Sequence, residues 1–124
     1  MRFPATWLAA ILTVSCAAPS GAAEIACRLD ALRPAERARY DELVGELEKN
    51  VGEVRELPDG YAFRLPADPK ALTRVAEWIT YERRCCPFFD FDLRWSSGEQ
   101  APWLRLTGSK EVKAFLAETA WVKR

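Results

Sequence analysis

Two adjacent cysteines, Cys85 and Cys86, are the residues of this chain whose type and spacing most favour chemistry. A third cysteine, Cys27, lies far from them in the sequence, and Glu82 precedes Cys86 by about one helical turn. The chain contains no histidine, so it lacks the commonest metal ligand and the commonest general base near neutral pH. Clustered thiolates without imidazole suit a soft ion such as Cu(I) or Hg(II), or trivalent arsenic. We therefore expect Cys27, Cys85, Cys86 and Glu82 to form a soft-metal or metalloid site.

A second interpretation makes the cysteines structural. Cysteine is among the most buried residue types and often packs as a small apolar side chain. Adjacent cysteines rarely pair with each other, because the small ring strains the disulfide. If a disulfide forms, we expect it to join Cys27 to either Cys85 or Cys86, within a non-catalytic interaction domain.

A third interpretation, less favoured than the first two, is a thiol redox enzyme. In such an enzyme Cys85 would be the more exposed nucleophile and Glu82 its base. Arg83 and Arg84 would lower the pKa of the thiols, whereas the negative end of the helix dipole would raise it. The Cys-Cys pair is neither the Cys-x-x-Cys motif of thioredoxin-type enzymes nor a complete zinc motif.

Glu82 is unusual because it lies on an otherwise apolar helical stripe. Burying an unpaired carboxylate is costly, so the simplest interpretation places Glu82 at the rim of the core, paired with an arginine. The alternative is that Glu82 acts as a ligand or proton acceptor beside a thiol.

The helix that positions these residues has clear boundaries. Asp68 is a natural N-cap and Pro69 a natural first helical residue, while Pro87 disfavours the helical conformation at Cys86. Helical periodicity predicts one apolar stripe, with Cys85 pointing to its side. That stripe comprises Leu72, Val75, Ala76, Ile79, Glu82 and Cys86.

The remaining elements alternate around this helix. We predict strands at 25–29, 54–57, 61–65, 89–95 and 103–107, with Cys27 facing inward from the first of them. We also predict a helix from Pro34 to about Asn50 and a last helix after Gly108-Ser109. The order β-α-β-β-α-β-β-α predicts an α+β fold. It would be a two-layer domain, with a largely antiparallel sheet and helices on one face.

The N-terminus predicts export. Residues 1–23 have the features of a signal peptide: Arg2, an apolar run, and small residues before a cleavage point after Ala23. Residues 24–124 would then form one periplasmic or secreted domain with no transmembrane helix. Two alternatives remain: an outer-membrane lipoprotein anchored by lipid at Cys16, or a cytoplasmic protein whose start codon is misassigned.

Charge and composition disfavour three common functions: nucleic-acid binding, serine-triad hydrolysis and P-loop nucleotide binding. The net charge is zero, which gives no electrostatic basis for binding nucleic acid. The residues of a histidine-dependent serine triad and of a phosphate-binding P-loop are absent.

Several segments together resemble a family of short uncharacterised bacterial proteins. They are Ile25 to Leu29, Glu36 to Arg39, Leu57 to Phe63, Glu82 to Phe89 (E-R-R-C-C-P-F-F) and Leu104 to Gly108. The resemblance spans nearly all of the chain after the leader and implies one compact domain but no reaction. Members of that family usually begin just before the first cysteine segment, so the leader is a departure from it.

Overall fold

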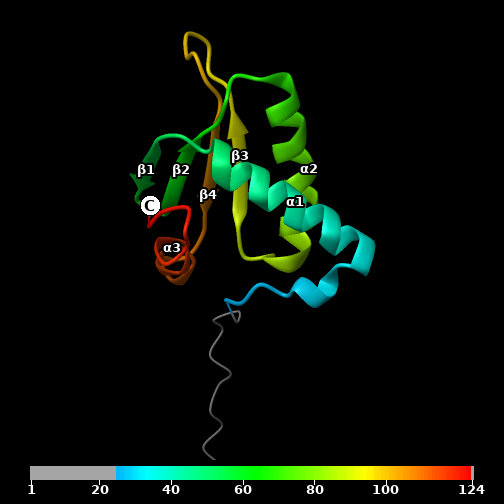
Figure 1. Ribbon diagram of the computed structural model, residues 1–124. Coiled ribbons are helices and arrows are strands. Elements are labelled where there is room, and N and C mark those ends of the chain that lie inside the picture. Colours follow the sequence, from blue (N-terminus) through cyan, green and yellow to red (C-terminus); the bar gives the residue numbers. More distant parts are fainter. Residues whose placement is uncertain (1–24, 124) are drawn as a thin grey trace, which may run out of the picture.

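The computed structural model describes residues 25–123. The leader predicted at 1–23 and the alternative lipid anchor at Cys16 lie outside these residues. The described part is built from a short 3-10 helix and seven longer elements (Figure 1). These are η1 (Leu29–Ala31), α1 (Pro34–Asn50), β1 (Val54–Leu57), β2 (Gly60–Arg64), α2 (Pro69–Cys85), β3 (Asp90–Arg94), β4 (Trp103–Thr107) and α3 (Lys110–Ala117).

The four strands form one sheet in the order β1-β2-β4-β3, and every neighbouring pair is antiparallel. Phe63 lies opposite Leu104, and Leu104 lies opposite Leu93 in the next strand. Because side chains alternate along a strand, this register places one row of apolar residues on the same face of the sheet. The predicted α+β fold with an antiparallel sheet is confirmed.

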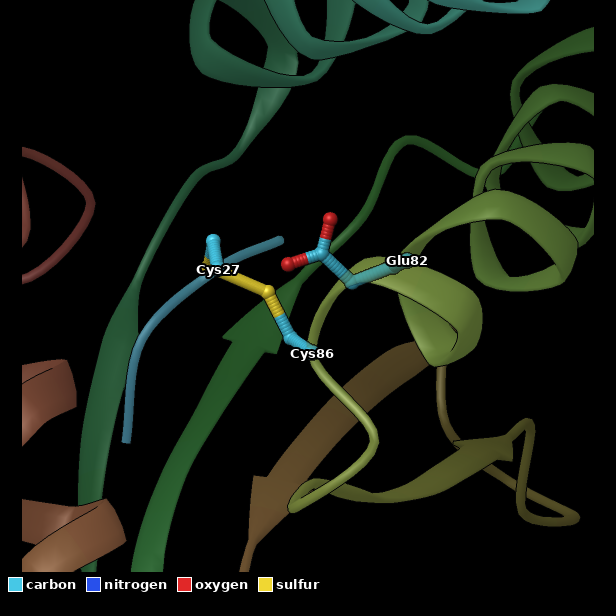
Figure 2. Close-up of side chains that lie close together, drawn as sticks. All are labelled: Cys27, Glu82 and Cys86. Atoms are coloured by element: carbon cyan, nitrogen blue, oxygen red, sulfur yellow. A yellow bond between two sulfur atoms is a disulfide. The ribbon is translucent and has the colours of Figure 1, made fainter. Parts of the chain in front are cut away.

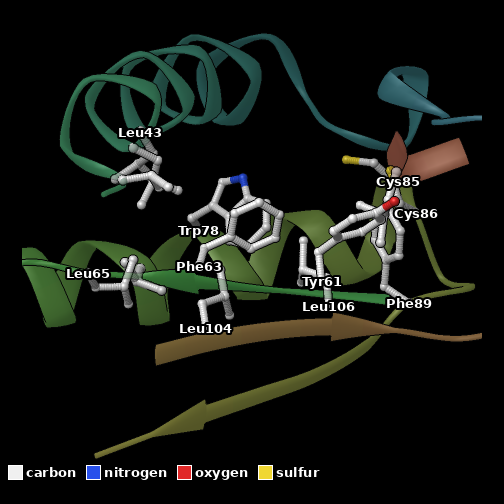
Figure 3. Close-up of a cluster of buried hydrophobic side chains, with 14 of the residues drawn as sticks. Leu43, Tyr61, Phe63, Leu65, Trp78, Cys85, Cys86, Phe89, Leu104 and Leu106 are labelled. Atoms are coloured by element: carbon white, nitrogen blue, oxygen red, sulfur yellow. The ribbon is translucent and has the colours of Figure 1, made fainter. Parts of the chain in front are cut away.

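The core lies on that apolar face, and all three helices contribute to it. Its buried members include Phe63, Leu65, Leu104 and Leu106 from the sheet region, Leu43 and Leu47 from α1, Val75 and Trp78 from α2, and Val112 and Leu116 from α3. Figure 3 shows Leu43 and Trp78 facing the row of sheet side chains. Within residues 25–123, no helix combines the length and apolar character needed to cross a membrane.

The strand predicted at residues 25–29 is wrong. Residues 25–28 are irregular and lead into η1, so the first β of the predicted order is missing. The segment lies against the end of α2 instead of a sheet edge, and the N–H of Arg28 donates to the carbonyl oxygen of Cys85 at 2.8 Å. An alternating sequence forms a strand only where a strand edge is available to satisfy its backbone groups.

The boundaries of α2 follow the prediction. The Asp68 side chain accepts a hydrogen bond from the backbone N–H of Lys70 at 3.2 Å, as an N-cap should. Cys86, before Pro87, leaves the helical conformation with φ −126° and ψ 68°.

The buried face of α2 differs from the predicted stripe. It comprises Val75, Trp78, Glu82 and Cys85, whereas Ala76 is exposed and Ile79 is only half-buried. The predicted stripe omits Trp78, which is 2% exposed. Because Trp78 is buried, Cys85 on the same side of α2 also faces the core. The backbone at Cys86 is not helical, so helical periodicity does not predict the direction of the Cys86 side chain.

Candidate thiol site at the end of α2

A disulfide joins Cys27 to Cys86 across 59 residues, with 4.9 Å between the two Cα atoms. Two pairings were predicted for Cys27, and the structure selects Cys86 over Cys85. Cys86 is fully buried, whereas Cys27 is not. The disulfide therefore ties the irregular segment that precedes η1 to the turn that follows α2.

Glu82 stands beside this disulfide (Figure 2). A carboxylate oxygen of Glu82 and the sulfur atoms of Cys27 and Cys86 all lie within 4.8 Å of one another. The Glu82 side chain projects from the last turns of α2, and the residue is only 5% exposed. Three of the four predicted site residues are thus together.

The partner of Glu82 is Tyr40, not an arginine, so the predicted arginine pair at the rim is wrong. The Tyr40 hydroxyl donates to Oε2 of Glu82 at 2.6 Å. Burial raises the pKa of Glu82, and the hydrogen bond from Tyr40 opposes that rise. Desolvation raises the pKa of Tyr40, and the hydrogen bond to Glu82 and the negative charge of Glu82 raise it further. No sequence signal pairs Tyr40 with Glu82, because the two residues are 42 positions apart.

The nearby arginines make other contacts. Arg84 pairs with Glu36 and donates to the carbonyl oxygen of Ala31 at 3.0 Å. Arg39 pairs with Glu77 at 2.8 Å and so links α1 to α2. These contacts hold η1 and α1 against α2. Because the two arginines pair elsewhere, the hydrogen bond to the Glu82 carboxylate comes from Tyr40.

Cys85 lies apart from the cluster. Its side chain is fully buried, and its thiol donates to the carbonyl oxygen of Tyr81 at 3.3 Å. Burial raises the pKa of the Cys85 thiol, the charge of Glu82 adds to that rise, and Arg84 opposes it. The expectation that Cys85 would be the more exposed thiol is therefore wrong.

Reduction of the disulfide would leave two thiols beside a carboxylate, which are groups of the kind that can hold a soft metal ion. Metal–thiolate bonds of about 2.3 Å, as in zinc sites, allow two sulfurs on one ion to lie up to about 4.6 Å apart. In this structure the two sulfurs are bonded to each other, and a Glu82 carboxylate oxygen lies within 4.8 Å of both. In the oxidised form both sulfurs are used in the disulfide, so the same atoms offer no thiolate.

Comparisons with protein-family models, curated proteins and solved structures give no match to this chain.

Proposed function

We propose that the reduced form of this protein binds a soft metal ion, Cu(I) or Hg(II), through the thiolates of Cys27 and Cys86, with Glu82 as an accessory ligand. The observation that supports this function is the convergence of two sulfurs and one carboxylate oxygen within 4.8 Å. Soft thiolate ligands favour such ions over harder cations. Cys85, which contacts Tyr81, takes no part.

Metal binding is coupled to the redox state of the protein in this proposal. An external dithiol reduces the disulfide, becoming oxidised itself, and leaves two thiols on the protein. Each thiol must lose its proton to become a ligand, so binding releases protons and strengthens as pH rises.

We also propose that the protein acts in the periplasm or outside the cell. The predicted leader supports this location, and so does a disulfide, because such bonds persist mainly in oxidising compartments.

The test is a competition titration of Cu(I) between the protein and a chromophoric chelator. Reduced protein should bind one ion per chain, and oxidised protein should show no binding, because both sulfurs are then in the disulfide. Cys27→Ser and Cys86→Ser should resemble the oxidised protein, while Cys85→Ser serves as the matched control and should bind like the unaltered protein. Equal affinity of the reduced and oxidised forms would end the proposal.

A second candidate function is a non-catalytic interaction domain with a structural disulfide. The hydrogen bond from Arg28 to Cys85 favours it, because the segment around Cys27 is held to α2 by backbone contacts as well as by the disulfide. This candidate would be preferred if the reduced protein lost stability without gaining any affinity for Cu(I).

A further inference from the structure

Strand β3 has one edge without a partner strand. In the sheet order β1-β2-β4-β3 it is an outer strand, and among the described residues it pairs only with β4 (Figure 1). An outer strand presents backbone N–H and C=O groups that can pair with a further strand, and proteins commonly block such an edge with lysine, proline or a bulge. Residues 90–94 contain neither lysine nor proline, and their register with β4 runs without a bulge. The backbone of this edge is therefore suited to pairing with another strand.

Exposed apolar side chains gather at the same edge. Within residues 25–123, the large hydrophobic side chains that are exposed are those of Leu93, at 38%, and Trp95, at 49%. The indole N–H of Trp95 donates to the carbonyl oxygen of Glu99 at 3.0 Å, so the ring is held in position although it is exposed. By contrast, Val54 and Leu57 of the opposite outer strand, β1, are both half-buried. Association at the β3 edge would therefore remove apolar surface from water.

An open groove of about 400 Å³ lies beside the start of β3. Its walls include Ile79 and Arg83 of α2 and Phe91 of β3. An arginine next to an apolar wall suits an aromatic ring, because the guanidinium group stacks on aromatic faces. Since side chains alternate along a strand, Phe91 shares its face of the sheet with Leu93 and with Trp95, which directly follows the strand. The groove can therefore receive an aromatic side chain that a neighbouring strand brings to this face.

The sequence of β3 is complementary to itself when two copies pair antiparallel. A two-fold axis through Leu93 sets Leu93 opposite its own copy and Phe91 opposite Trp95. The same register sets Asp92 opposite Arg94 on the other face of the sheet, where the two side chains of one chain lie 3.8 Å apart and are 45% and 60% exposed. Opposite charges across a pair of strands are stabilising and like charges are destabilising. An axis through Asp92 would set two aspartates opposite each other, so the register through Leu93 is favoured.

We propose that two copies of this chain form a symmetric dimer by antiparallel pairing of their β3 strands about Leu93. The two sheets then become one continuous sheet, with the helices of both copies on the same face. Trp95 of each copy packs against Phe91 and the groove of the other copy, and such reciprocal contacts are typical of a two-fold interface. This inference goes beyond metal binding, since it needs neither reduction of the disulfide nor a metal ion.

The experiment measures the mass of the oxidised, metal-free protein by sedimentation equilibrium. The unaltered protein should be a dimer in reversible equilibrium with its monomer. Asp92→Arg and Arg94→Asp each set like charges opposite each other, so each variant alone should dimerise at least about tenfold more weakly. An equimolar mixture of the two variants should dimerise again, because the arginines of one chain then face the aspartates of the other. Arg55→Asp, on the opposite outer strand β1, is the matched control and should dimerise like the unaltered protein.

A second measurement needs no altered protein. Backbone amides of β3 that point away from β4 should exchange their hydrogen more slowly in concentrated protein than in dilute protein, whereas the amides of β1 should exchange at the same rate in both. Protein that stays monomeric at its highest soluble concentration would overturn the inference. So would a dimer that both charge variants form as strongly as the unaltered protein, or a mixture of the variants that stays monomeric. These results leave the metal proposal untouched, because no metal or reductant is present.

Discussion

Tyr40 on α1 donates its hydroxyl hydrogen to the carboxylate of Glu82 on α2, at 2.6 Å and across 42 residues of sequence. This contact accounts for the presence of a carboxylate in the apolar face of α2. Buried charged groups are tolerated when they are hydrogen-bonded and are costly when they are not.

Replacing Tyr40 with phenylalanine should therefore destabilise the protein by about 1–3 kcal/mol, because the carboxylate loses its donor while remaining buried. The measurement is urea denaturation at neutral pH. The double variant Tyr40→Phe with Glu82→Leu completes a mutant cycle, because leucine offers no acceptor, and the two single effects should not add. Strict additivity would show that the hydrogen bond contributes nothing to stability.

Glu82 should make stability fall as pH rises. Its pKa in the folded protein lies above the unperturbed value of 4.5, so the folded state keeps a proton that the unfolded chain has lost. The contribution of Glu82 is complete below pH 4.5 and is lost as pH rises through the raised pKa.

The check compares the unfolding free energies of the unaltered protein and Glu82→Gln from pH 4.5 to neutral pH. The difference between the two should grow in favour of the variant as pH rises. Glu36 and Glu77, whose pKa values are lowered, act in the opposite direction and at lower pH. Glu36 and Glu77 are present in both proteins, so their contributions cancel in the difference between the two unfolding free energies. A difference independent of pH would contradict the assignment.

Loss of the disulfide should cost about 4 kcal/mol, the loop-entropy value for a bridge that spans 59 residues. Cys27→Ser should show this loss with or without reductant, whereas the unaltered protein should show it only after reduction. The measurement is chemical denaturation of both proteins in both conditions. Equal stability of the oxidised and reduced unaltered protein would mean that the backbone contacts of the 25–32 segment suffice to hold it.

Cys85 should resist alkylation in the folded state. Its side chain is fully buried and its thiol pKa is raised, so little reactive thiolate is available to a reagent. Peptide mapping after iodoacetamide treatment should find Cys85 unmodified in native oxidised protein and fully modified in denaturant. Rapid labelling under native conditions would restore Cys85 as a candidate nucleophile.

Gly60 should tolerate no side chain. A Cβ atom at this position would lie 2.0 Å from the backbone oxygen of Leu106 in the paired strand β4, so one of the two strands must move. We expect Gly60→Ala to lose about 2–4 kcal/mol, within the range for strained or overpacked sites. Gly45→Ala is the matched control, because nothing lies within 4 Å of its added methyl group. It should gain about 0.5–1 kcal/mol from helix propensity. Similar effects of the two substitutions on the unfolding midpoint would contradict the close approach.

Local sequence determined most of the secondary structure of this protein. Asp68 and Pro69 start α2, Pro87 ends it, and Ser109 caps α3 by accepting from Val112. These features act through backbone geometry within a few residues, so they can be identified without knowing the fold. The sequence likewise limited the partner of Cys27 to two adjacent residues, because a disulfide between neighbours is strained.

Only the tertiary structure decided which residues distant in the sequence contact each other. The choice of Cys86 over Cys85 depends on the rotation of α2 that buries Trp78, and on the change of backbone direction at Cys86. The 25–28 segment is not a strand because it contacts the end of α2 and no sheet edge, and Glu82 is satisfied by a hydroxyl from α1. Such contacts join residues about 40 to 60 positions apart, and they follow from packing in three dimensions, which a local pattern does not encode.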